Sequence, residues 1–277
     1  MPEETNVPAW SAMLGRGHAV VGMVHLGALP GSPGATLPVG EICEQAAREA
    51  KVLGDAGIDA IIVENMHDVP YLHGDRLGPE ATACMTAAII EVVSSVSCPV
   101  GAQILSGGNR QAIASCLAGG GGFIRCENFV FSHVADEGLL PEAEAGMLLR
   151  YRRSIGADRI GVFCDVKKKH ASHAITGDLS IAEAAAGAAF FGADALIVTG
   201  SHTGERTSTD DVAEAAKAGL PVLVGSGADA GSLASLFEHA NAVIVGSALK
   251  RDGRWQNPVD PARVDAMIAE RDRLRRS

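Results

Sequence analysis

Three short apolar runs in the C-terminal half of the chain end in small residues that suit a phosphate group. They are Val198-Thr199-Gly200, Val224-Gly225-Ser226-Gly227 and Val245-Gly246-Ser247. Glycine amides at the end of a buried strand can cradle a phosphate, above all where a helix begins next. We therefore predict a phosphate site built from backbone amides and hydroxyls of Gly200, Gly225, Ser226, Gly227, Gly246 and Ser247.

Ionisable side chains end several other apolar runs. Glu64 follows Ile61-Ile62-Val63 and is a candidate base or metal ligand. Arg125 and Glu127 are two residues apart, so they share one face of a strand. There they either orient a substrate or form a stabilising ion pair. His25 closes the first run, either as a proton shuttle or as a satisfied structural histidine.

The segment after Phe163 is the richest in such groups. Asp165 and Lys167 share a strand face, and a lysine beside a carboxylate can act as an acid or base. With a depressed pKa, Lys167 could form a Schiff base. His170 and His173 are three apart, so on a helical turn both could bind one metal ion. We therefore expect that the reaction needs either no cofactor or a divalent metal. The alternative interpretation of the run Lys167-Lys168-Lys169 is a solvated loop without a catalytic role.

Eight apolar runs, separated by Ala-rich helical segments, are the elements that must position these residues. Strand and helix alternate without a break, which implies a parallel sheet, and eight such units close into a TIM (β/α)8 barrel. An open doubly wound sheet is the runner-up, but no G-x-G-x-x-G follows the first strand. The predicted strands are Ala19–His25, Ala60–Asn65, Val100–Leu105, Phe123–Asn128, Ile160–Val166, Ala195–Thr199, Val222–Gly225 and Ala242–Gly246.

Catalytic groups of such barrels gather at the carboxyl ends of the strands, and all the polar residues named above lie at such ends. We expect one domain over residues 1–277, with the barrel at about 18–250 and a terminal helix at about 260–276. The long loop Phe129–Leu140 is expected to cover the site.

Charge and cysteine content indicate which classes of binding partner and which compartment suit the protein. The 277 residues carry a formal net charge of −10, which argues against nucleic acid and anionic membranes. The six cysteines are scattered through apolar runs without a C-x-x-C pair, as in a cytoplasmic protein. The N-terminus does not read as a signal peptide, and no run reaches transmembrane length. A homo-oligomer is compatible with the sequence.

Several motifs resemble those of the BtpA/SgcQ family. The resemblance runs from about residue 18 to about 268 and implies a TIM barrel of the ribulose-phosphate-binding type. The family name comes from a photosystem I biogenesis factor, and other members are described as sugar-metabolism or nucleosidase-like enzymes. Besides the three glycine-rich segments above and Lys250, it is carried by His25-Leu26, Leu29-Pro30-Gly31-Ser32-Pro33, Val63-Glu64-Asn65, Asp68-Val69-Pro70, Phe123-Ile124-Arg125, Asp136-Glu137-Gly138 and Asp165-Val166-Lys167-Lys168-Lys169-His170.

These observations predict an enzyme that acts on a small phosphorylated metabolite, a sugar phosphate or a nucleotide-derived one. Its acid–base chemistry would be that of an isomerase, epimerase, lyase or nucleosidase-like enzyme. Two alternatives stay open: a non-catalytic assembly or stability factor of the BtpA type, and a metal-dependent hydrolase. The candidate catalytic residues are His25, Glu64, Arg125, Glu127, Asp165, Lys167 and His170.

Overall fold

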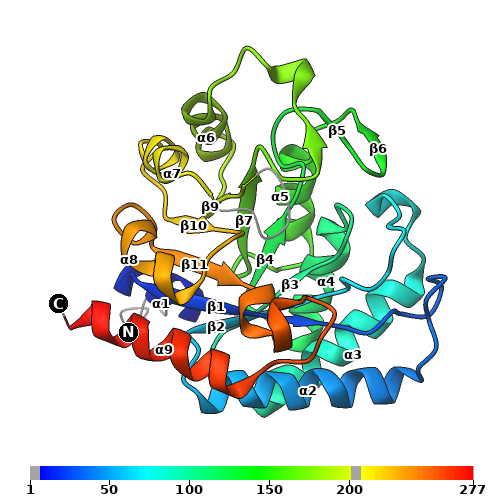
Figure 1. Ribbon diagram of the computed structural model, residues 1–277. Coiled ribbons are helices and arrows are strands. Elements are labelled where there is room, and N and C mark those ends of the chain that lie inside the picture. The colour runs from blue at the N-terminus through cyan, green and yellow to red at the C-terminus, as the bar shows by residue number, and fades with distance from the viewer. Residues whose placement is uncertain (1–6, 201–206, 277) are drawn as a thin grey trace, which may run out of the picture.

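Eight parallel strands close into a barrel in the computed structural model, which describes residues 7–200 and 207–276 (Figure 1). The hydrogen-bonded order is β1-β11-β10-β9-β7-β4-β3-β2, and β1 pairs with both β2 and β11, which closes the ring. An open doubly wound sheet is thereby excluded. The barrel strands are β1 Ala19–His25, β2 Ala60–Glu64, β3 Val100–Gln103, β4 Phe123–Cys126, β7 Gly161–Val166, β9 Ala195–Val198, β10 Val222–Val224 and β11 Ala242–Val245.

All eight predicted strands are confirmed: β1 has the predicted bounds, and each of the others differs from the prediction by one or two residues at one end. Glu127, Gly225 and Gly246 lie just past the last paired residue of β4, β10 and β11, respectively. The inter-strand ladder stops where each chain segment turns toward its helix, so these residues begin the loops at the barrel mouth.

Helices surround the barrel and connect successive strands (Figure 1). Local sequence fixes several of their starts: Ser180 and Glu183 form a capping box at the start of α6, and Asp260 caps α9 with Pro261 at its first position. The predicted C-terminal helix is thereby confirmed. The connecting helices are α2 Val39–Asp55, α3 Pro79–Ser95, α4 Asn109–Gly119, α5 Ala145–Ser154, α6 Ile181–Phe190, α7 Thr209–Ala216 and α8 Leu233–Leu236, and the chain ends with α9 Pro261–Arg275.

The barrel interior is filled by apolar side chains that alternate along the strands with residues facing the helices. Ile62, Phe123 and Phe163 belong to this interior cluster, and the two phenyl rings stack with their centroids 4.7 Å apart. The same alternation places Glu64, Arg125 and Asp165, each two residues further along its strand, directly above this layer. The interior packing thus aims three ionisable groups at the mouth.

A short helix that the sequence did not suggest closes the opposite end of the barrel. This helix, α1 (Ala9–Arg16), buries Met13 and Leu14 in the interior cluster, with Trp10 packed beside them. The indole Nε1–H of Trp10 donates to the carbonyl of Arg159 at 3.1 Å. The floor of the barrel is therefore sealed by the chain itself, and access is left at the strand carboxyl ends.

The loops after β4 and β7 pair with each other. Within the predicted loop Phe129–Leu140, strands β5 (His133–Ala135) and β6 (Gly138–Leu140) form an antiparallel hairpin. Strand β8 (Ala171–Ser172), from the loop after β7, pairs with β5 on its other side. The small sheet therefore couples the covering loop to the lysine-rich segment.

Across residues 7–200 and 207–276, no helix combines the length and apolar character that crossing a bilayer requires.

Candidate active site

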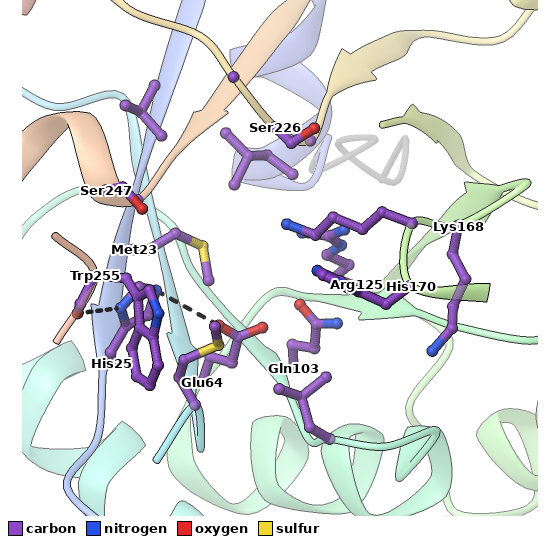
Figure 2. A pocket seen from close by; sticks show the side chains of 18 of the residues that line it. Met23, His25, Glu64, Gln103, Arg125, Lys168, His170, Ser226, Ser247 and Trp255 are labelled. Atoms are coloured by element: carbon purple, nitrogen blue, oxygen red, sulfur yellow. Dashed lines mark hydrogen bonds and ion pairs between the residues drawn. The ribbon is translucent and has the colours of Figure 1, made fainter. Parts of the chain in front are cut away.

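A cavity of about 480 Å³ opens at the carboxyl ends of the barrel strands. Ser226 and Ser247 lie across this cavity from Glu64 and Gln103 (Figure 2). The interior layer and α1 close the barrel below, so a ligand must enter from the loop side. The residues predicted from the sequence that line the cavity are His25, Glu64, Arg125, Glu127, His170, Gly225, Ser226, Gly227, Gly246 and Ser247.

His25 and Glu64 meet at the ends of the neighbouring strands β1 and β2 (Figure 2). Nε2 of His25 lies 3.5 Å from Oε2 of Glu64. Nδ1 of His25 lies 3.2 Å from the backbone carbonyl oxygen of Trp255. Because a carbonyl only accepts, Nδ1 carries the ring proton and Nε2 presents its lone pair to Glu64.

Burial sets the protonation of this pair. It lowers the pKa of His25 to about 3, with help from the charge of Lys250. It raises the pKa of Glu64 to about 7, although Arg125 and Lys169 act in the opposite direction. At neutral pH the contact therefore joins a neutral imidazole to a carboxyl group that is about half protonated. Such a carboxyl group can both accept and return a proton in one reaction cycle.

Arg125 and Asp165 form a buried ion pair between β4 and β7. Nε and Nη2 of Arg125 donate to the two carboxylate oxygens, both at 2.9 Å. A Cβ at Gly225 would lie 3.4 Å from Nη2 and 2.6 Å from Ile197, so the glycine leaves room for the guanidinium. Asp165 lies behind Arg125 and outside the set of cavity-lining residues. Asp165 is thus a positioning residue for Arg125, whose guanidinium faces the ligand space.

A second buried ion pair joins Glu127 to Lys168. Nζ of Lys168 donates to Oε1 of Glu127 at 3.1 Å, and the amide of Gly107 donates to Oε2 at 2.8 Å. Burial acts to raise the pKa of Glu127, but Lys168 and the Gly107 amide outweigh it and hold the pKa below its usual value. Glu127 therefore remains an anion at neutral pH and anchors the loop after β7.

Lys167 does not face the cavity, and that prediction was wrong. Strand β7 ends at Val166, and Lys167 has a left-handed φ of 49°, so strand alternation no longer applies. Its ammonium donates to the carbonyl of Leu179, which lies just before α6 in the chain. Lys168 and Lys169 line the cavity in its place. The amide of Lys169 donates to Oγ1 of Thr199 at 3.0 Å, which turns this residue inward.

The predicted phosphate residues lie along the rim formed by the loops after β10 and β11, with one exception. Gly200 is absent from the cavity lining of the described chain, and its amide donates to Oγ of Ser226 at 2.8 Å. Gly200 therefore holds the Ser226 side chain of the rim by a hydrogen bond instead of lining the cavity itself. Ser247 and Ala248 begin the short 3-10 helix after β11, and both residues line the cavity.

His170 and His173 do not share a helical turn, contrary to the prediction. His170 has a φ of 55° and lies at the exposed edge of the cavity, and the extended strand β8 separates it from His173. Nε2 of His173 donates to the carbonyl of Lys168 at 2.9 Å. Among the described residues, no three or more His, Cys, Asp or Glu side chains group as metal ligands. The described structure therefore does not bring His170 and His173 together as a pair of metal ligands.

The model of the BtpA family matches residues 16–273. This chain belongs to the BtpA family. It is 43% identical over 263 residues to an uncharacterized mitochondrial protein of Caenorhabditis elegans, covering 93% of this chain and 94% of the relative. It is 36% identical over 251 residues to the photosystem I biogenesis protein BtpA of Synechocystis, covering 90% of this chain and 86% of that one.

Solved structures share the fold of this BtpA family protein. The N-(5'-phosphoribosyl)anthranilate isomerase of Pyrococcus furiosus aligns with a TM-score of 0.56 at 13% identity, covering 92% of this chain and all (100%) of that one. A tryptophan synthase chain of M. tuberculosis aligns with a TM-score of 0.59 at 15% identity, covering 95% and 99%. These likenesses confirm the TIM-barrel fold.

Three of the groups that line the cavity of this BtpA family protein are not among the predicted catalytic residues: Gln103, Lys169 and Trp255. Gln103 ends the apolar β3, which is the same signal that identified Glu64, but its amide does not titrate and so suggested no catalytic role. Its Oε1 is buried without a hydrogen-bond partner in the described structure. Trp255 follows the last strand, and only the tertiary fold brings its carbonyl to His25.

Proposed function

We propose that this protein is an enzyme that moves a proton on a small phosphorylated metabolite, as an isomerase or epimerase does. One observation carries the proposal: a carboxyl group with a pKa of about 7, on Glu64, faces a cavity beside a histidine held neutral. A general base works best when its pKa lies near the working pH, and buried carboxylates in clefts are frequent catalytic groups.

Each side chain has a role in this reaction. Glu64 takes the proton from the substrate and returns it to a neighbouring atom. His25 accepts a hydrogen bond from the protonated carboxyl group through Nε2, because the Trp255 carbonyl holds the other ring nitrogen as a donor. Arg125, fixed by Asp165, stabilises the negative charge that develops on the substrate oxygen.

The rim of glycines and serines supports a phosphorylated substrate. Gly225, Ser226, Gly227, Gly246 and Ser247 line the cavity after β10 and β11, the seventh and eighth barrel strands in chain order. Barrels of this architecture frequently bind phosphate at these two loops. The structural neighbours include, by name, enzymes of phosphorylated compounds, such as an orotidine 5'-monophosphate decarboxylase.

The proposal is tested in two steps. First, a thermal-shift screen compares phosphorylated sugars and nucleotides with their dephosphorylated counterparts, and only the phosphorylated compounds are expected to raise the melting temperature. Second, each stabilising compound is incubated with the protein in deuterated water, and deuterium uptake into carbon-bound positions is followed by mass spectrometry. Glu64→Gln is expected to abolish the exchange and keep the binding. Glu44→Gln, on the exposed face of α2, is the matched control.

Each alternative predicts a different result. A non-catalytic assembly factor of the BtpA type would bind a phosphorylated ligand without exchange. A metal-dependent hydrolase would lose activity on chelation and regain it with a divalent metal. Failure of every phosphorylated compound and of inorganic phosphate to raise the melting temperature would contradict the proposal itself.

A further inference from the structure

Among the described residues, the cavity lysine Lys169 has no acidic partner at hydrogen-bond distance, whereas its buried neighbours Arg125 and Lys168 each have one. Arg125 is bonded to Asp165, and Lys168 is bonded to Glu127. Within residues 7–200 and 207–276, no carboxylate or carbonyl lies at hydrogen-bond distance from the Lys169 ammonium. A cation that is partly withdrawn from water without a direct counter-ion is unfavourable. Lys169 therefore presents a positive group to the cavity without a direct counter-ion among the described residues.

The neighbouring charges act on Lys169 in both directions. Burial, followed by the Arg125 guanidinium, lowers the pKa of Lys169, and the more weakly acting carboxylates of Glu64, Asp165 and Glu127 oppose this without reversing it, so the two cations lie close enough to repel each other. Asp165 occupies Nε and Nη2 of Arg125, and Nη1 makes no hydrogen bond to the described residues. An anion placed between the Lys169 ammonium and Nη1 would accept hydrogen bonds from both and relieve the repulsion.

This anion position differs from the phosphate rim. Lys169 follows β7, whereas the glycine and serine rim follows β10 and β11, and β9 lies between β7 and β10 in the barrel. Both positions open on the same cavity of about 480 Å³. One small molecule with an anionic group at each end can therefore reach both.

We infer that the ligand carries a carboxylate in addition to its phosphate, with the carboxylate bound by Lys169 and Arg125. The inference rests on the proposed function, because it assigns the phosphate to the rim. It narrows the substrate class from phosphorylated metabolites in general to phosphorylated carboxylic acids. Gln103, whose Oε1 is buried without a partner in the described structure, lies on the same side of the cavity as Glu64 and can accept from a hydroxyl group of this ligand (Figure 2).

The experiment compares two ligands that differ at one carbon. 3-Phosphoglycerate and glycerol 3-phosphate share the three-carbon chain and the phosphate ester, but the first has a carboxylate where the second has a hydroxymethyl group. Isothermal titration calorimetry on the full-length protein at low ionic strength measures Kd for both, and for inorganic phosphate. We expect 3-phosphoglycerate to bind about tenfold more tightly than glycerol 3-phosphate.

Two lysine variants test the assignment. Lys169→Met is expected to weaken binding of 3-phosphoglycerate about tenfold and to leave glycerol 3-phosphate unchanged, since only the carboxylate loses a partner. Lys167→Met, two residues away with its ammonium on the Leu179 carbonyl, should leave both constants unchanged.

The outcomes separate the inference from the proposed function. Equal affinity for the two esters, with phosphate binding intact, would overturn the carboxylate inference and leave the phosphate proposal standing. A preference for 3-phosphoglycerate that survives Lys169→Met would place the carboxylate elsewhere and also overturn it. Absence of binding by all three probes would contradict the phosphate proposal, and the inference would fall with it.

Discussion

Replacing Glu64 with glutamine should stabilise the protein at neutral and alkaline pH. The pKa of Glu64 in the folded protein, about 7, lies above the ordinary value of 4.5, because burial disfavours the carboxylate. The folded state therefore holds this proton more tightly than the unfolded state. The corresponding stability is complete below about pH 4.5 and is lost as the pH rises through about 7.

The size of the effect follows from the same two values. The gap between 4.5 and about 7, at about 1.4 kcal/mol per pKa unit, amounts to about 3 kcal/mol. A glutamine at position 64 keeps the shape of the side chain but carries no charge at any pH. The stability difference between Glu64→Gln and the wild type should therefore grow by about 3 kcal/mol between about pH 4.5 and about pH 8.5.

Equilibrium urea unfolding, followed by circular dichroism across this pH range, measures the difference. Glu127→Gln is the matched control at the same end of the barrel, and its stability difference from the wild type should stay nearly constant across this range. Lys168 holds the pKa of Glu127 below its usual value of 4.5 despite burial, so the loss of stability in this variant should shrink only when the pH falls below that value. A constant difference between Glu64→Gln and the wild type would show that Glu64 is ionised throughout and would refute the reasoning.

Two further predictions concern the barrel itself. Asp165→Asn leaves the buried Arg125 guanidinium without its counter-ion. Urea unfolding should show that the variant loses about 3 kcal/mol or more of unfolding free energy. A loss below about 1 kcal/mol would contradict a buried pair in which each charge depends on the other. Gly101→Ala places a Cβ 2.4 Å from the Phe123 ring and should lower the free energy of unfolding by about 1–3 kcal/mol. Gly15→Ala in α1 is the control: its Cβ meets no atom within 4 Å, so the variant should be as stable as the wild type or more stable. Equal melting temperatures for the two variants would argue against tight packing of the barrel interior.

The sequence by itself determined the barrel, because its signals are local. Each strand is a short apolar run bounded by a turn, and each connecting segment has helical periodicity, so eight repeats could be counted without knowledge of any contact. Strand alternation likewise predicted that Arg125 points inward, which the structure confirms. The residues at strand ends, among them Glu64 and Gly246, could be identified because the end of a strand is visible in the sequence.

Only the tertiary structure decided which of these groups face the ligand. Alternation holds while a strand is paired, and β7 ends before Lys167, so the positive φ at that residue turned Lys167 outward and left Lys169 in the cavity. The tautomer of His25 depends on the carbonyl of Trp255, 230 residues away in the chain. The pKa of Glu64 depends on burial by elements from the whole barrel. Protonation and orientation are set by neighbours in space, and a sequence does not reveal those neighbours before the chain has folded.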